Sequence, residues 1–178
     1  MMYIPEQIER VLLTEEEIKA KVREMGEQLT KEYAGKNPLF ICVLKGSVVF
    51  FADLIREIRC PMEINFLRAS SYGSGTVSSG RVELEIGSDI DFGGRHVVLV
   101  EDILDTARTL HRLKSDLSEL SPASLRIVTL LDKPSRRVVK GFSADLTGFE
   151  IDDLFVVGYG LDCGEKYRNL PYVGVLRT

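Results

Sequence analysis

The amino-acid sequence predicts an α/β fold built on a central, mainly parallel sheet. Two short aliphatic runs, at 39–44 and 96–100, are each followed by a turn and then by a longer segment with helical periodicity. A third run, at 124–131, leads into Lys133 and Pro134. Strands that alternate with helices pair in parallel, and helices cover both faces of such a sheet. We therefore expect each run to be a buried strand.

The first helix is expected in the segment TEEEIKAKVREMGEQL. Thr14 and Glu17 have the spacing of a capping box, and the apolar residues that follow recur at helical intervals. We expect this helix to end near Gly35 and Pro38. Its apolar face contains Ile18, Val22, Met25 and Leu29.

The later elements continue the alternation of strands and helices. The segment VVFFADLIREI is too long for a strand and is expected to be a helix. We expect a strand at 97–100, a turn at 102–106, and a helix that begins at Thr106 or Thr109 and carries regularly spaced leucines. Two apolar runs near the end of the chain, LFVVGY and YVGVL, add further strands.

Composition excludes several classes of protein. The 178 residues, 44% hydrophobic and 28% charged, suit one globular domain, and the net charge of -4 without a Lys/Arg-rich block argues against nucleic acid as a partner. Cys42, Cys60 and Cys163 are isolated thiols without zinc-ligand spacing, which we expect to be reduced. The first residues lack an apolar leader and no apolar run approaches a membrane span, so we expect a cytoplasmic protein with no membrane partner.

Three carboxylates follow the strand at 97–100. Glu101 and Asp102 stand together at its end and Asp105 lies in the turn, before backbone N–H groups that would converge on an anion at a helix N-terminus. Paired carboxylates beside a phosphate fit either recognition of sugar hydroxyls or Mg²⁺ held directly or through water. The alternative is a solvated acidic loop with Asp105 as a helix cap. The strand before the loop and the helix after it favour the binding site.

The segment ASSYGSGTVSSG, residues 69–80, contains five serines and three glycines. Such a segment buries too little apolar surface to order itself, so it is either a hairpin connection or a lid that closes over a ligand. Its Gly73-Ser74-Gly75 sequence does not complete a dinucleotide fingerprint, because Ser78 stands where the third glycine is required.

The segment VVLVEDILDTARTL resembles the phosphoribosyl-diphosphate-binding signature of the type I phosphoribosyltransferases. Four more segments, in the same order along the chain, resemble the branch of that family that uses hypoxanthine and guanine: CVLKGSVVFFADL, SSYGSGTVSSG, TLLDKPSRR and LFVVGYGLDCGEKYRNLPYVGVL. The resemblance implies the type I phosphoribosyltransferase fold in one domain over 1–178, with a twisted, mainly parallel sheet flanked by helices. It also implies a small hood formed by about 1–13 and 150–178, and a flexible lid at about 69–80.

The same resemblance implies a binding site for the donor, phosphoribosyl diphosphate. Glu101 and Asp102 would contact the ribose hydroxyls with Mg²⁺ nearby, and Asp162 would bind a second Mg²⁺ with help from water. Pyrophosphate would be bound by Arg168 and by the turn Leu44-Lys45-Gly46, in which the Leu44–Lys45 peptide is typically cis. The residues that would wrap the 5′-phosphate are Asp105, Thr106, Ala107, Arg108 and Thr109.

For the purine, the resemblance implies that Lys133 donates to the 6-oxo group, Phe155 stacks on the base and the Val156 backbone reads the edge at the 2-position. Ile103 and Asp162 would complete this site. Asp105 and Lys133 would be the catalytic pair: Asp105 as base or hydrogen-bond partner of N7, and Lys133 as stabiliser of charge on the 6-oxo oxygen. The lid would include Ser71 and Tyr72.

The implied activity is the Mg²⁺-dependent conversion of hypoxanthine or guanine to its nucleoside monophosphate, with release of pyrophosphate, in purine salvage. The alternatives are a xanthine- or uracil-directed phosphoribosyltransferase and an RNA-binding regulator on the same fold. The acidic balance and the lack of a basic stripe argue against the regulator. Relatives of this kind assemble, so a homotetramer or homodimer is expected by resemblance.

Ala107 departs from the family pattern, which has glycine at this position. We expect Ala107 at negative φ, because positive φ would cost alanine on the order of 1–2 kcal/mol. Alanine keeps the N–H that binds phosphate, so Ala107→Gly is expected to change donor affinity by less than about tenfold.

Overall fold

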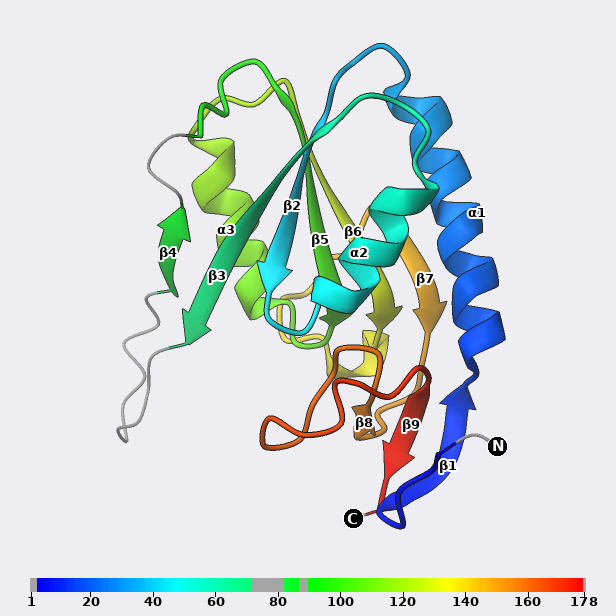
Figure 1. Cartoon of the computed structure of the whole chain (residues 1–178). Coiled ribbons are helices and arrows are strands. Elements are labelled where there is room, and N and C mark those ends of the chain that lie inside the picture. The colour runs from blue at the N-terminus through cyan, green and yellow to red at the C-terminus, as the bar shows by residue number, and fades with distance from the viewer. Residues whose placement is uncertain (1–2, 72–81, 87–89, 178) are drawn as a thin grey trace.

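The computed structural model describes residues 3–71, 82–86 and 90–177, and it forms two sheets flanked by helices (Figure 1). The larger sheet has the strand order β4-β3-β2-β5-β6-β7, in which β4 runs antiparallel to β3 and every other pair is parallel. Its strands are β2 (Leu39–Leu44), β3 (Glu63–Ser71), β4 (Val82–Ile86), β5 (His96–Leu104), β6 (Ser124–Asp132) and β7 (Leu146–Glu150). The predicted mainly parallel α/β sheet is confirmed.

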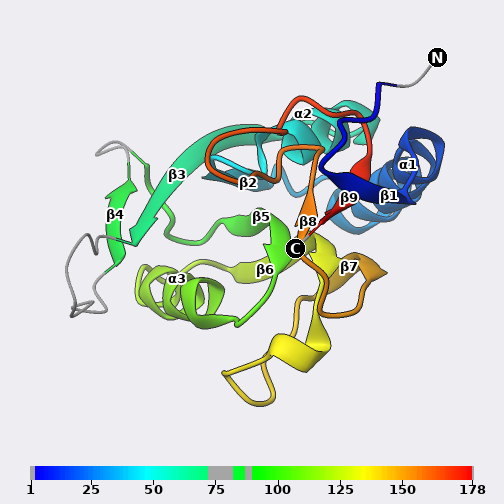
Figure 2. The same ribbon diagram turned by 90° about the horizontal axis from the view of Figure 1, so that it is seen from below.

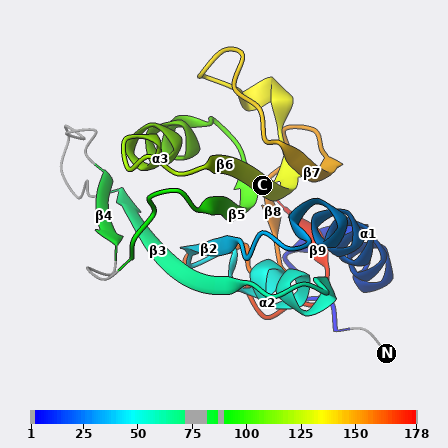
Figure 3. The same cartoon turned by 90° about the horizontal axis from the view of Figure 1, so that it is seen from above.

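Helices cover both faces of this sheet (Figure 3). One face packs against α1 (Glu15–Tyr33) and α2 (Val48–Glu57), and the other packs against α3 (Arg108–Ser118). Alternate residues of β2 separate the two cores: Phe40 faces α1 and α2, whereas Ile41 lies in the α3 cluster. The continuous aliphatic runs are therefore explained by burial on both sides.

The first helix confirms its predicted cap. The Thr14 hydroxyl accepts from the Glu17 backbone N–H at 3.2 Å, and the Thr14 N–H donates to Glu17 Oε2 at 2.8 Å. The predicted apolar face is buried, and the helix ends at Tyr33, just before Gly35.

The smaller sheet joins the two ends of the chain in the order β1-β9-β8. Its strands are β1 (Ile8–Leu13), β8 (Val156–Val157) and β9 (Val173–Leu176), and Ile8, Val157, Leu170 and Tyr172 form its own buried cluster. The parallel strands of the larger sheet point their carboxyl ends toward it (Figure 1). Figure 2 shows the long loop after β8 crossing the end of β2.

The structure corrects three boundaries. β5 continues to Leu104 instead of ending at Val100, so Glu101 and Asp102 lie within the strand and the turn is shorter than predicted. The helix expected to begin at Thr106 or Thr109 begins at Arg108, with Ala107 as its N-cap. The strand expected over LFVVGY is limited to Val156–Val157, because the chain turns sharply with positive φ from Gly158 to Gly160.

The sequence did not reveal β1 and β7 as strands. Both lie at the edge of a sheet and most of their residues are partly or fully exposed, so neither has the uniform aliphatic composition of the central strands. Among the described residues, none of the helices combines the length and the apolar character needed to cross a membrane.

Candidate active site

A cavity of about 270 Å³ lies at the carboxyl ends of β2 and β5. It brings together most of the residues predicted to bind the donor sugar and its 5′-phosphate, although Arg108 does not line it. Ligands bind at this edge in open parallel sheets. Its lining consists of Val43, Leu44, Glu101, Asp102, Ile103, Leu104, Asp105, Thr106, Ala107, Thr109 and Leu110.

Ala107 contradicts the prediction of negative φ. Its φ is 68°, in the left-handed region, and its side chain is buried against the α3 cluster. The reason is the short connection: β5 ends at Leu104 and α3 begins at Arg108, so the chain reverses within three residues. A turn this tight commonly needs one residue with positive φ, which explains why the family pattern has glycine here.

Glu101 and Asp102 lie side by side at the base of the cavity. The Asp102 N–H donates to Glu101 Oε1 at 3.1 Å, and Asp102 is 8% exposed. Burial, and then the negative charge of Asp102, raise the pKa of Glu101 well above its ordinary value. Burial also raises the pKa of Asp102, although a hydrogen bond to Glu101, backbone N–H groups and Arg168 act in the opposite direction.

This carboxylate pair fits a divalent cation. Carboxylate oxygens are preferred ligands of Mg²⁺, and a cation would favour the charged form of both carboxyl groups, which burial disfavours. Within the described ranges, however, no group of three Asp, Glu, His or Cys side chains is placed to hold a metal ion alone. Mg²⁺ bound here would complete its coordination with oxygens of the substrate and water.

The turn after β2 packs directly against the carboxylates. The Leu44–Lys45 peptide is cis, as the resemblance implies. A Cβ atom on Gly46 would overlap the carboxylate of Asp102, and a Cβ atom on Gly160 would overlap the carbonyl oxygen of Gly46. Glycine is therefore required at both positions for the turn to lie between Asp102 and the loop after β8.

Arg168 lies on that loop and reaches toward the same turn. Its Nη1 donates to Gly160 O at 2.8 Å and its Nη2 pairs with Asp162 Oδ1 at 2.9 Å. Glu165 pairs with both predicted pyrophosphate ligands, at 3.3 Å from Lys45 Nζ and 3.5 Å from Arg168 Nη2. These charges hold the pKa of Glu165 below its usual value. Glu165 was not identified from the sequence, although it lies within the most diagnostic segment.

The predicted purine residues come from both sheets: Ile103 lies in β5 and Val156 in β8. Lys133 follows β6 and is 7% exposed, and its N–H donates to Leu104 O at 3.0 Å. Phe155, in contrast, is 51% exposed although it stands in an apolar run. An exposed aromatic ring beside the buried Val156 is available for stacking on a planar base.

Two arginines of the TLLDKPSRR segment contact the loop after β5, and neither was predicted as a site residue. Arg136, at the end of the short 3₁₀ turn η1 (Pro134–Arg136), pairs through Nε with Asp105 at 3.1 Å and with Asp153 at 3.6 Å. Arg137 donates to main-chain carbonyls of the same loop. The paired basic residues after Lys133 were the available signal, but isolated arginines usually indicate a solvated surface.

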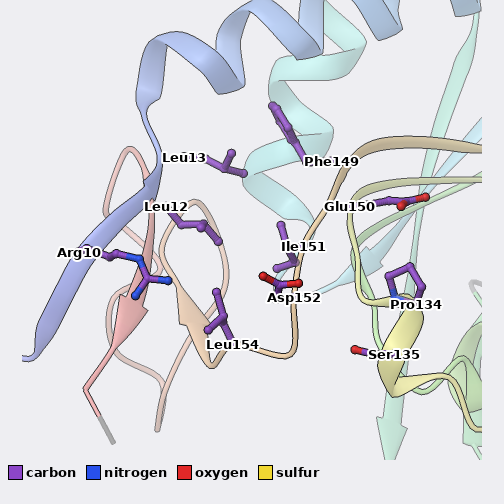
Figure 4. Close-up of a pocket in the computed structure, with 10 residues that line it drawn as sticks. All are labelled: Arg10, Leu12, Leu13, Pro134, Ser135, Phe149, Glu150, Ile151, Asp152 and Leu154. Atoms are coloured by element: carbon purple, nitrogen blue, oxygen red, sulfur yellow. The ribbon is translucent and has the colours of Figure 1, made fainter.

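A larger cavity, of about 580 Å³, lies between β1, β7 and η1 (Figure 4). It is lined by Arg10, Leu12, Leu13, Pro134, Ser135, Phe149, Glu150, Ile151, Asp152 and Leu154, and it contains none of the predicted site residues. We place the chemistry in the smaller cavity because the carboxylate pair lies there, together with most of the phosphate loop, the name used here for residues 105–109, which are predicted to wrap the 5′-phosphate. The predicted lid residue Tyr72 and the side chain of Ser71 lie outside the described residues.

Comparison with known proteins agrees with this geometry. Residues 11–163 match the family model described as a phosphoribosyl transferase domain. Over 170 residues, or 96% of the chain, the sequence is 55% identical to the hypoxanthine-guanine phosphoribosyltransferase of Lactococcus lactis, of which 92% is covered. Over the same length it is 50% identical to the enzyme of that name from Streptococcus thermophilus, of which 94% is covered.

Solved structures give the same result. The structure superimposes on a crystal structure of a hypoxanthine phosphoribosyltransferase from Staphylococcus aureus with a TM-score of 0.90 and 45% identity, covering 96% of this chain and 92% of that one. The chain therefore belongs to the phosphoribosyltransferase family, in the group whose curated members are named hypoxanthine-guanine phosphoribosyltransferases.

Proposed function

We propose that the protein transfers the 5-phosphoribosyl group from phosphoribosyl diphosphate to N9 of hypoxanthine or guanine, giving IMP or GMP and pyrophosphate. The observation that carries this proposal is the cavity at the end of β5, where the carboxylates of Glu101 and Asp102, the tight loop before α3 and the cis turn after β2 meet. Lys133 and the exposed Phe155 supply groups suited to a 6-oxopurine nearby. The names of the relatives support the same activity.

The residue types suit the charges that develop in this reaction. Breaking the bond between C1 of the ribose and pyrophosphate leaves positive charge on the sugar and negative charge on the leaving group. Glu101 and Asp102 would stabilise the sugar, whereas Lys45 and Arg168 would bind the pyrophosphate. Because Glu165 pairs with both cations, pyrophosphate would have to displace its carboxylate. When bound, Mg²⁺ would supply additional neutralisation of the diphosphate.

On the purine, Asp105 would accept the proton or a hydrogen bond from N7, and Lys133 would donate to the 6-oxo oxygen. Arg136 pairs with the Asp105 carboxylate and so orients it before a substrate binds. Phe155 would stack on the base and the backbone of Val156 would contact the edge at the 2-position. Asp162 would contribute to the purine site and to a second Mg²⁺.

We further propose that residues 1–178 act as one domain in which about 1–13 and 150–178 form a hood over the purine. The composition of 69–80, with Ser71 and Tyr72, supports a lid that excludes water from the reacting sugar. A homodimer or homotetramer in the cytoplasm, with no nucleic-acid partner, completes the proposal.

The direct test is to supply the purified protein with phosphoribosyl diphosphate, Mg²⁺ and one base at a time. Pyrophosphate should be released with hypoxanthine or guanine, and omission of Mg²⁺ should abolish the release. Faster turnover with xanthine or uracil would reassign the acceptor. Absence of turnover with every base would overturn the proposal, and a salt-sensitive gel shift with RNA would then support a regulatory role.

A further inference from the structure

The backbone carbonyl groups of residues 104–106, at the start of the phosphate loop, accept hydrogen bonds from one segment, residues 133–139. Leu104 O accepts from the Lys133 N–H at 3.0 Å and from Arg137 Nη1 at 3.1 Å. Asp105 O accepts from the same Nη1 at 2.5 Å. Thr106 O accepts from the N–H groups of residues 138 and 139, at 3.1 and 3.3 Å. Three consecutive carbonyl groups are therefore bound on the same side.

Arg137 is itself held in place by a nearly buried partner. Its Nη2 pairs with Asp132 Oδ1, and the two side chains are 11% and 8% exposed. Asp132 is the last residue of β6 and stands opposite Leu104 in the register of β5 and β6. One guanidinium thus connects the ends of two adjacent strands to the start of the phosphate loop. The planar fork of arginine can meet several acceptors in this way, whereas the single ammonium group of lysine cannot do so with fixed geometry.

The bound carbonyls determine where the loop N–H groups point. In a trans peptide the C=O and the following N–H point in opposite directions. Because the carbonyls of Asp105 and Thr106 face the segment 133–139, the N–H groups of Thr106 and Ala107 face away from it. Neither N–H has a hydrogen-bond partner among the described residues, so both remain available to a ligand in the cavity that these residues line.

We propose that Arg137, oriented by Asp132, is a positioning residue for the 5′-phosphate of the donor. It does not touch the donor but fixes the peptide planes whose N–H groups do. This inference rests on the proposed function, since it assumes that the loop binds the donor phosphate. It predicts a selective effect on donor binding, because neither Arg137 nor Asp132 is assigned a contact with the purine.

Arg137→Lys tests the proposal while keeping the positive charge. We expect the KM for phosphoribosyl diphosphate to rise about tenfold, since hydrogen bonds to two carbonyls are lost or weakened, while the KM for hypoxanthine stays within about twofold. Calorimetric binding of ribose 5-phosphate should weaken by a similar factor. Lys140→Gln, an exposed substitution three residues further along, serves as the matched control and should leave all three values unchanged.

Asp132→Asn is a second test, for use if Arg137→Lys does not fold. It keeps the shape of the side chain that orients Arg137 but removes its charge, so it should also weaken donor binding. Unchanged binding of ribose 5-phosphate in a folded variant, or equal increases in both KM values, would overturn the role of Arg137. If the wild type binds ribose 5-phosphate but turns over no purine, the proposed function fails and the role of Arg137 in phosphate binding stands.

Discussion

Ala107 shows at the scale of one residue how a loop imposes a conformation that its side chain disfavours. Its φ is 68°. It lies between Thr106, whose carbonyl oxygen accepts hydrogen bonds from residues 138 and 139, and the first turn of α3. A left-handed conformation costs an L-residue roughly 1–2 kcal/mol. Alanine pays this cost with the smallest side chain after glycine, and its methyl group is buried among the α3 residues.

We expect Ala107→Gly to change the free energy of unfolding by less than about 1 kcal/mol. Glycine adopts the left-handed conformation without strain, which favours the variant by roughly 1–2 kcal/mol. Against this, loss of the buried methyl group destabilises the folded state by about 0.8 kcal/mol, and the greater freedom of glycine in the unfolded chain by about 0.4–1 kcal/mol. The KM for phosphoribosyl diphosphate should stay within about tenfold, because the N–H is retained. Urea unfolding and donor kinetics measure the two effects.

Ala107→Val provides the contrast, because a β-branched residue is a severe outlier at positive φ. It should lower the free energy of unfolding by about 2 kcal/mol or more. The control is Ala20→Val, on the exposed face of α1, where the helix-propensity cost is about 0.5 kcal/mol. Equal losses in the two valine variants would show that the loop does not impose the conformation.

At Glu101 the proposed function and the stability of the folded protein favour different side chains. We expect Glu101→Gln to stabilise the metal-free protein near neutral pH, because it removes the negative charge that stands beside Asp102 at the strand end. The same change should strongly reduce transferase activity, since it removes a carboxylate that we propose contacts the ribose. Melting temperatures recorded without divalent cations, together with activity with Mg²⁺, measure the two effects.

The pH dependence gives this prediction a definite sign. The pKa of Glu101 is raised in the folded state, so the folded protein binds this proton more tightly than the unfolded chain does. Its contribution to stability is present below the unfolded pKa and is lost as pH rises through the folded pKa. The advantage of Glu101→Gln should therefore be larger at about pH 8 than at about pH 5. Glu150→Gln, which removes a carboxylate at the exposed end of β7, is the control against which the effect of Glu101→Gln is compared at each pH.

At the scale of elements, the central strands and the helices could be predicted because their patterns are local. The run 39–44 matches β2 at both ends, and the helix after Thr14 has the predicted cap and buried face. The end of β5 could not be predicted, because Glu and Asp are depleted in strands. Pairing of Glu101 with Thr129 and of Leu104 with Asp132 on β6 overrides that preference.

The same distinction applies to the site. Glu101, Asp102 and Asp105 could be identified because they follow one another in a single motif at a strand end. Arg137 and Glu165 could not, because their roles depend on which carbonyl or cation lies opposite them in space. The φ of Ala107 was predicted wrongly for a related reason: it depends on the length of β5, which the partner strand sets.

The capping box of α1 gives a test at the element scale that is separate from catalysis. Thr14→Ala removes the hydroxyl that accepts from the Glu17 N–H, so we expect a loss of about 1 kcal/mol in the free energy of unfolding. The melting temperature should fall by about 2–4 °C, with the kinetic constants unchanged. Glu16→Gln, in the same turn but outside the cap hydrogen bonds, is the control. A change in kcat would instead connect the start of α1 to the site.

At the scale of the whole molecule, the site lies where the large sheet and the sheet of the chain ends meet. β1 pairs with β9 across almost the full length of the sequence, with Ile8 opposite Leu176 and Leu13 opposite Val173. No local pattern contains such a pairing, which is why the hood was implied by resemblance and not by periodicity. The loop between β8 and β9, which carries Asp162 and Arg168, lies against the turn at Gly46.

A hydrogen bond between two side chains attaches this loop to α2. The hydroxyl of Tyr159 donates to Asp53 Oδ2 at 2.7 Å, next to Gly160, which contacts the carbonyl of Gly46. Burial, and then the bond to Asp53, raise the pKa of Tyr159, so its hydroxyl remains a donor throughout the working range of pH. Tyr159 thus anchors to α2 the loop segment that holds Arg168 near Lys45.

We expect Tyr159→Phe to raise the KM for pyrophosphate in the reverse reaction by about threefold to tenfold, because Arg168 is held less firmly. The KM for IMP should change by less than about twofold, since Lys133 follows β6 and the carbonyl oxygen of Phe155 is held by the Leu176 N–H of β9, independently of the Tyr159 hydroxyl. The control is Tyr167→Phe on the same loop, because the Tyr167 hydroxyl makes no hydrogen bond to another described residue. Equal changes in both KM values, or an equal effect of the control, would mean that the hydroxyl of Tyr159 stabilises the hood as a whole and does not position the pyrophosphate site.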